Sequence, residues 1–467
     1  MNCSCGPGPD TIPPSLLRHY CFVLARPLFD MFNLSLSIVY LPSVWESSCI
    51  VPIHKSGSKS DVKNYRPVSI LNVIPKLFEN ILTEYITPAL GALIIDEQFG
   101  FMCRKSTELN LLSYVDYLLQ ALESGMEVHS IYTDFSKAFD RVNHELSWSK
   151  RKTAGVGGPL LDWFRSYLQD RVQVARVHGF GSRSIRVTSG VPQGSHVGTL
   201  LFNLFINDIH SCFKSSNFLL FADDLKLFAR VGSPEDCDLL QLDLNRLANW
   251  CVLNGMELNT AKCHLMTFSR SRNPLTFQYK IQDTVLDLVT SIQDLGIILD
   301  TSLSFIAHIQ KIKSKALRML GFVMRSAQDF HNPLSFRSLY CSLVRSHLEY
   351  ASSVWNPFYT VHIRNLERVQ HRFLRQVSFR MFHEYRTNEE LQSFLGILSL
   401  ESRRKHRDLR LLYNVLNNIN QCPHLLARIP LFVPPRATHS NTFYYNFNRT
   451  QYGLNLFLSW STVCQLL

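Results

Sequence analysis

Two short apolar runs that each end in aspartate constrain the fold of this chain most. The first run, residues 128–132, precedes residues 134–140 (DFSKAFD). The second run, residues 218–221 (FLLF), precedes residues 222–224 (ADD), and the run 225–228 follows them. Short apolar runs of this kind predict buried strands, and the second pair predicts a hairpin with two adjacent acids at its turn. We therefore expect a sheet that carries concentrated negative charge at one end.

The three carboxylates at these strand ends predict a metal site. Asp134, Asp223 and Asp224 would supply the oxygen ligands that Mg²⁺ or Mn²⁺ prefers. Two such ions can activate an attacking hydroxyl and stabilise the leaving oxygen in phosphoryl transfer. An Asp-Asp pair alone is weak support, because it is more often a turn or a solvated surface.

A loop rich in glycine, residues 189–195 (SGVPQGS), precedes an apolar helical stretch. The glycines allow its backbone to approach a flat ligand, and the Gln193 amide offers a donor and an acceptor there. The alternative is a simple helix start that is capped by Ser195.

Basic residues gather in the last third of the chain. From Thr301 onward there are 21 Lys and Arg against 8 Asp and Glu, whereas the preceding residues are nearly balanced, at 27 against 29. This asymmetry indicates a polyanionic partner, although a solubilising surface is the alternative. One predicted helix places apolar residues on one face and four arginines on another. The arginines are Arg364, Arg368, Arg372 and Arg375.

Composition narrows the class of protein. With 46% hydrophobic and 18% charged residues the chain is globular, and no apolar run is long enough to cross a bilayer. The first residues do not resemble a signal peptide, so we expect an intracellular protein of the nucleus or cytoplasm. The 12 cysteines form no paired Cys-x-x-Cys motif, which favours reduced thiols over a structural zinc site.

The order of the motifs resembles that of the LINE-type (non-LTR) retrotransposon reverse transcriptases. The matching segments follow one another at suitable spacing over most of the chain. They are residues 64–69 (NYRPVS), 98–101 (QFGF), 134–140, 190–195, 221–224, 258–262 (LNTAK) and 295–300 (LGIILD).

The resemblance implies an α+β right-hand polymerase and a role for each matching residue. Residues 1–300 would form the fingers and a palm with an antiparallel sheet, and residues 301–467 a basic, helical thumb and tail. Asp134, Asp223 and Asp224 would hold two Mg²⁺ or Mn²⁺ ions, and Lys262 would protonate the leaving pyrophosphate. Lys55, Arg66, Phe139 and Gln193 would bind the incoming nucleotide, with Phe139 excluding a 2′-hydroxyl.

The resemblance also implies the reaction and the partners. The chain would transfer nucleotides from dNTPs to a primer 3′-hydroxyl on an RNA template, and the four arginines would contact nucleic acid rather than a membrane. No endonuclease segment is recognisable, so we expect a truncated element or nicking by an endonuclease supplied in trans.

Several residues depart from the family pattern. Thr199 stands where a proline is usual, Met102-Cys103 replaces a basic residue, and the segment after Leu146 contains Trp148 and Arg151 where leucines are usual. These departures leave open the alternative of a catalytically decayed remnant that only binds RNA or DNA.

Overall fold

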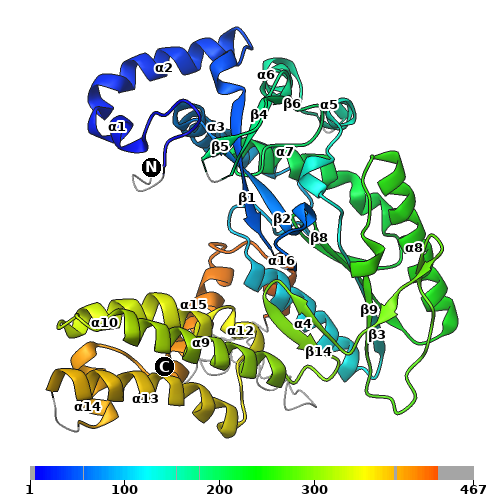
Figure 1. The fold of residues 1–467 in the computed structure, drawn as a ribbon. Helices are drawn as coiled ribbons and strands as arrows, with labels where there is room; N and C mark the ends of the chain where they lie inside the picture. Colours follow the sequence, from blue (N-terminus) through cyan, green and yellow to red (C-terminus); the bar gives the residue numbers. More distant parts are fainter. Residues whose placement is uncertain (1–5, 56, 154, 178, 383–385, 430–467) are drawn as a thin grey trace, which may run out of the picture.

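Two five-stranded mixed β-sheets, two small two-stranded sheets and a large helical region make up the described part of the protein (Figure 1). The structure, a computed structural model, describes residues 6–55, 57–153, 155–177, 179–382 and 386–429, without the side chains of residues 381 and 382. The helices are α1 (Pro14–His19), α2 (Cys21–Ser37), α3 (Val73–Gly91), α4 (Thr107–Glu123), α5 (His144–Thr153), α6 (Gly158–Leu168), α7 (His196–Ile206), α8 (Pro234–Leu253), α9 (Ile306–Ser326), α10 (Pro333–Leu339), α11 (Ser346–Glu349), α12 (Ser352–Trp355), α13 (Thr360–Phe382), α14 (Asn388–Leu395), α15 (Leu400–Leu416) and α16 (Pro423–Arg428). The strands are β1 (Ser47–His54), β2 (Tyr65–Leu71), β3 (Glu127–Thr133), β4 (Val172–Val177), β5 (Phe180–Gly181), β6 (Ile185–Arg186), β7 (Asn217–Phe221), β8 (Asp224–Val231), β9 (His264–Phe268), β10 (Lys280–Ile281), β11 (Thr284–Val285), β12 (Asp287–Leu288), β13 (Ser291–Asp294) and β14 (Ile297–Asp300).

The sheet with strand order β12-β9-β3-β8-β7, here called the palm sheet, lies at the centre of the protein. Successive side chains of a strand point to opposite faces, so each strand contributes to two cores. Tyr132 and Phe228 pack with α4, whereas Ile131 and Leu227 pack with α7 and α8. Each fully buried large apolar side chain of this kind contributes about 1.5–3 kcal/mol. The expected strands at 128–132, 218–221 and 225–228 are confirmed.

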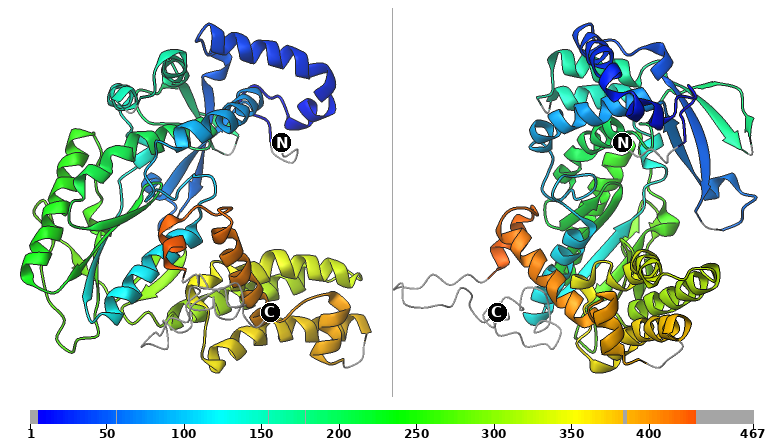
Figure 2. Two further views of the ribbon diagram at one scale, coloured as in Figure 1. Left: turned by 180° about the vertical axis from the view of Figure 1, so that it is seen from behind. Right: turned by 90° about the vertical axis from the view of Figure 1, so that its left-hand side faces the viewer.

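The second sheet joins strands that are far apart in the sequence. β1 pairs antiparallel with β2 and parallel with β4, which also pairs with β5 and β6. Figures 1 and 2 show this sheet and α1–α3 on one side of the palm sheet, and the helices of the last third on the other. The α+β, hand-like arrangement expected from the sequence is thus confirmed.

Every regular element between Ile306 and Arg428 in the described part of the chain is a helix. These helices share a hydrophobic core with α4, β3 and β14. Polar contacts join the same parts: Arg407 of α15 lies 2.8 Å from the carboxylate of Glu108, and Arg428 donates to Asp116 over 3.3 Å. The division near residue 300 stays a prediction, because this core is continuous across it.

Arg151 of α5 is a fully buried cation that faces no carboxylate in the described structure. One Nη donates to the Leu201 carbonyl over 3.2 Å, and the guanidinium lies 4.7 Å from the Trp148 ring. Its Nε and other Nη have no hydrogen-bond partner among the described residues. Burial lowers the pKa of Arg151 to about 9, so the side chain is still charged at neutral pH.

We expect Arg151→Leu to stabilise the protein by about 1–4 kcal/mol, because it removes a desolvated charge with incomplete partners. Thermal or urea unfolding measures the change. Lys152→Leu is the matched control, since Lys152 is exposed and its replacement should leave the free energy of unfolding almost unchanged. Destabilisation by Arg151→Leu alone would mean that the contacts with Trp148 and Leu201 outweigh the desolvation of the guanidinium.

The nine cysteines in the described residues are all free thiols, and six of them are buried. Within the same residues no helix has the length and apolar character required to cross a membrane.

Candidate active site

Asp134, Asp223 and Asp224 come together at one end of the palm sheet. Asp134 directly follows β3, and Asp223 lies in the turn between β7 and β8. Because β3 and β8 pair Thr133 with Leu225, the residues that flank this pair, Asp134 and Asp224, lie at the same end. The turn expected from the sequence is present, and its tightness forces Ala222 into the left-handed region at φ 58°.

Burial and the neighbouring carboxylates raise the pKa values of Asp223 and Asp224. Burial raises the pKa of Asp223, and the charge of Asp134 raises it further. Partial removal of water by the surrounding protein, followed by the charges of Asp223, Asp294 and Asp134, raises the pKa of Asp224 to about 6. Such repulsion is relieved by a bound cation, so the donor set fits a divalent metal. In the described residues, however, no three His, Cys, Asp or Glu side chains are grouped closely enough to form a ready-made metal site.

A buried ion pair lies beside this end of the sheet. Lys226 of β8 contacts the Asp294 carboxylate at 2.5 Å, and both side chains are less than a tenth exposed. The ammonium also lies 4.7 Å from the centre of the Tyr114 ring. Burial lowers the pKa of Lys226, and the Asp294 charge opposes that shift. The pair fixes the Lys226 ammonium two residues after Asp224.

The turn that carries Asp223 is held by the buried side chain of Gln98. Its Oε1 accepts hydrogen bonds from the Gly100 and Ala222 N–H groups, both over 2.8 Å, and its Nε2 donates to the Ala222 carbonyl over 3.3 Å. A Cβ on Gly100 would lie 2.1 Å from the Ala222 nitrogen. The segment 98–101 is therefore a support for the acidic turn.

The glycine-rich loop packs against both the acidic segment and the β1–β2 hairpin. The Val191 N–H donates to the Phe139 carbonyl, and the Ser69 N–H donates to the Gln193 carbonyl, each over 2.8 Å. The Gln193 side chain donates to the Asp140 carboxylate over 3.1 Å. Ser195 caps α7, as the alternative reading predicted, by accepting from the Gly198 N–H. The loop thus both begins a helix and holds Gln193 beside the acidic segment.

Glu79 of α3 fixes the start of α7. Its carboxylate accepts from the Tyr167 and Ser195 hydroxyls, both over 2.7 Å, and from the His196 N–H over 3.0 Å. Burial strongly raises the pKa of Tyr167, and the Glu79 charge adds to this rise. The hydroxyl therefore stays protonated and available as a donor.

Phe139, Lys55 and Arg66 lie around the acidic residues. The Phe139 ring stacks on Phe202 of α7 with a centroid distance of 4.2 Å and is only partly buried. Lys55 follows β1 and Arg66 lies on β2, and both are exposed. The positive charges of both side chains lower the pKa of Asp223 and so oppose its rise. Both cations are therefore near enough to Asp223 to act on its charge.

Lys262 forms an ion pair with Asp134. The ammonium lies 3.2 Å from the carboxylate, and the lysine side chain is 62% exposed. The Asn259 N–H also donates to the Asp134 carbonyl. The segment that contains Lys262 is thus attached to the first acidic segment.

The four arginines of α13 are all exposed, while Leu366, Val369 and Phe373 on the other face are buried. The structure places them on the helical region, apart from the carboxylates. A second basic row that sequence reasoning missed follows α9 at spacings of four, three and seven, which keep its members near one face of the helix. Its exposed members are Lys311, Lys315, Arg318 and Arg325.

The supporting residues Glu79 and Lys226 were also missed by sequence reasoning. Glu79 is one acid among others in an ordinary helical pattern, and no local signal marks it. Lys226 interrupts an apolar strand, and this departure from the pattern was the signal available for it.

Comparison with known proteins agrees with the motif order. The family described as reverse transcriptase (RNA-dependent DNA polymerase) matches residues 53–324. A probable RNA-directed DNA polymerase from transposon X-element and the RNA-directed DNA polymerase from mobile element jockey, both of Drosophila melanogaster, are each 27% identical over 80% of this chain. The chain spans about two fifths of these relatives, 42% in each case. Among solved structures, apo telomerase from Candida tropicalis has a TM-score of 0.46 at 10% identity over 75% of this chain and 61% of that chain. The resemblance expected from the sequence is confirmed.

Proposed function

Because this chain belongs to the reverse transcriptase (RNA-dependent DNA polymerase) family, we propose that it is an RNA-directed DNA polymerase of a non-LTR retrotransposon. The observation that carries the proposal is the meeting of Asp134, Asp223 and Asp224 at one end of the palm sheet, where, in addition to burial, Asp134 raises the pKa of both other carboxyls and Asp223 raises that of Asp224. A cluster of acids with raised pKa values beside a buried lysine is typical of a site for chemistry rather than of a part built for stability.

The three aspartates would hold two Mg²⁺ or Mn²⁺ ions. Such ions activate the attacking 3′-hydroxyl and stabilise the leaving oxygen. Asp223 and Asp134 would carry most of the binding, since Lys55 and Arg66 already act to keep Asp223 ionised. The Lys226 ammonium would offset part of the charge at Asp224, since it lowers the pKa of that carboxyl against the larger effects of burial and of Asp223, Asp294 and Asp134.

The residues around the carboxylates fit an incoming dNTP. Arg66 and Lys55 would neutralise the triphosphate, a task that suits the bidentate geometry of arginine. Gln193, oriented by Asp140, would contact the base pair. Lys262 would protonate the pyrophosphate, and its contact with Asp134 supports a position close to the reacting atoms.

The partners follow from the same proposal. The exposed arginines of α13 and the basic row of α9 would contact the phosphates of RNA template and DNA primer, largely without regard to sequence. Target nicking would come from an endonuclease, either in a longer form of this protein, as the length of its relatives suggests, or supplied in trans.

Primer extension by the purified protein tests the function. A DNA primer annealed to RNA should be extended with dNTPs in the presence of Mg²⁺ or Mn²⁺, and EDTA should stop synthesis. A decayed remnant would bind the same hybrid without extending it. We do not favour that alternative, because the acidic turn, the glycine-rich loop and their supports keep a mutually consistent arrangement.

Phe139→Ala should increase incorporation of ribonucleotides relative to deoxyribonucleotides by about tenfold or more, because loss of the ring opens space beneath the sugar for one hydroxyl. Single-nucleotide incorporation with each substrate measures the ratio. Loss of the contact with Phe202 will also lower stability, so the ratio is compared at a temperature where the variant is folded. An unchanged ratio in an active variant would show that Phe139 only packs against α7.

A further inference from the structure

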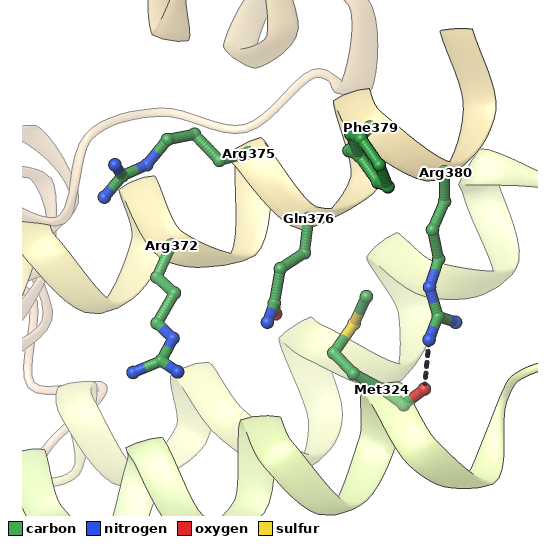
Figure 3. Close-up of a pocket in the computed structure, with 6 residues that line it drawn as sticks. All are labelled: Met324, Arg372, Arg375, Gln376, Phe379 and Arg380. Carbon is green, nitrogen blue, oxygen red and sulfur yellow. Dashed lines mark hydrogen bonds between the residues drawn. The ribbon is translucent and has the colours of Figure 1, made fainter. Parts of the chain in front are cut away.

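A pocket of about 520 Å³ lies between α9 and α13 in the helical region (Figure 3). Figure 3 shows two adjacent rows of side chains on α13: Arg372, Gln376 and Arg380 extend toward α9, and Arg375 and Phe379 lie beside them. Met324 of α9 completes the lining. This pocket is separate from the carboxylates, because its residues belong to helices that extend away from the palm sheet (Figure 1).

One arginine of the pocket is held by hydrogen bonds, and two others have no partner among the described residues. Arg380 donates to the Met324 carbonyl over 2.7 Å and to the Ala327 carbonyl over 3.3 Å, so it ties α13 to the end of α9. Arg372 and Arg375 are exposed and make no hydrogen bond or ion pair within the described residues. Two guanidinium groups without partners on neighbouring rows form a site for phosphate groups.

The other residues that line the pocket indicate that its ligand is more than a phosphate group. The Phe379 ring is 77% exposed between arginines, an unusual position for a large apolar side chain. The buried Oε1 of Gln376 has no hydrogen-bond partner in the described structure. A phosphodiester group cannot satisfy this acceptor at neutral pH, because it carries no proton and its oxygens only accept hydrogen bonds. The ligand must therefore offer negative charge, a flat face and a hydrogen-bond donor.

We propose that this pocket binds an unpaired nucleotide of a single-stranded nucleic acid. The phosphates would lie against Arg372 and Arg375, the base would stack on Phe379, and an amino, imino or sugar hydroxyl group would donate to Gln376. A duplex does not offer these three features together, because its base faces are covered by neighbouring bases. This inference rests on the proposed function in one respect: the polymerase function identifies the bound strand as part of the template or primer.

Fluorescence anisotropy with the full chain and a labelled oligouridylate RNA of about ten nucleotides tests the pocket. Phe379→Leu should weaken binding about tenfold, which is within the range for loss of one stacked base. Binding of inorganic polyphosphate should stay unchanged in the same variant, because the arginines remain. Tyr413→Leu is the matched control, since Tyr413 is a similarly exposed aromatic residue on α15.

Each outcome bears on the proposal. Equal weakening of RNA and polyphosphate, or no weakening of either, would overturn it, because the ring would then not read a base. A DNA oligonucleotide of matching sequence assigns the strand: tighter RNA binding indicates the template, and equal or tighter DNA binding the primer or target, and both support the pocket. Absence of extension in the wild-type protein would contradict the polymerase function alone, because strand binding requires no catalysis.

Discussion

Asp223→Asn should abolish primer extension while the protein becomes no less stable. Loss of one carboxylate weakens metal binding and the stabilisation of charge in the transition state, which at about 4 kcal/mol lowers the rate about a thousandfold. Binding of the RNA–DNA hybrid should remain nearly intact, because the expected phosphate contacts lie on α9 and α13. Single-turnover addition of one nucleotide at saturating hybrid measures the chemical effect.

The stability of this variant provides an independent check. Burial and Asp134 raise the pKa of Asp223 in the folded protein above its unfolded value. An acid with a raised folded pKa lowers stability once pH exceeds the unfolded pKa, so its removal should stabilise the metal-free protein at neutral pH. Asp283→Asn, in the exposed turn between β10 and β11, removes the same charge elsewhere and should change neither property. Extension at the wild-type rate in Asp223→Asn would disprove the metal assignment.

Gly100→Ala should also remove activity, but through the shape of the acidic turn. The added Cβ would lie 2.1 Å from the Ala222 nitrogen and 2.8 Å from the Phe221 carbonyl carbon, and both are backbone atoms that cannot move aside alone. We expect a loss of about 1–3 kcal/mol in the free energy of unfolding, as for other overpacked sites. Extension should fall at least about a hundredfold, because small displacements of reacting groups have effects of this size.

Gly91→Ala is the matched control for this substitution. Gly91 ends α3, and a Cβ there would meet only the Met102 methyl at 3.8 Å and a Thr87 methyl at 4.0 Å. That variant should retain both stability and extension. If Gly100→Ala melts like the wild-type protein and still extends primers, the contact between residue 100 and the acidic turn has no part in positioning Asp223.

The sequence predicted the strands, the acidic turn and the arginine face of α13 because each depends on local periodicity or on neighbouring residues. It could not predict Gln98 as the support of the turn, or Glu79 as the support of α7, because both contacts span more than 100 residues. The burial of Arg151 was equally hidden, since helical periodicity did not place this charge in the core. The metal-binding and nucleotide-binding roles stay predictions, although several of the residues expected to have these roles do lie in one region, around Asp223.

The continuous core between α4, the palm sheet and the C-terminal helices has a consequence for the history of this protein. Leu118 of α4 and Leu425 of α16 belong to one hydrophobic cluster, and Glu108 and Asp116 anchor arginines from the end of the described chain. A recombination event near residue 300 would leave both products with an unmatched apolar surface. Exchange between related elements should therefore preserve residues from α4 to α16 as a single inherited block.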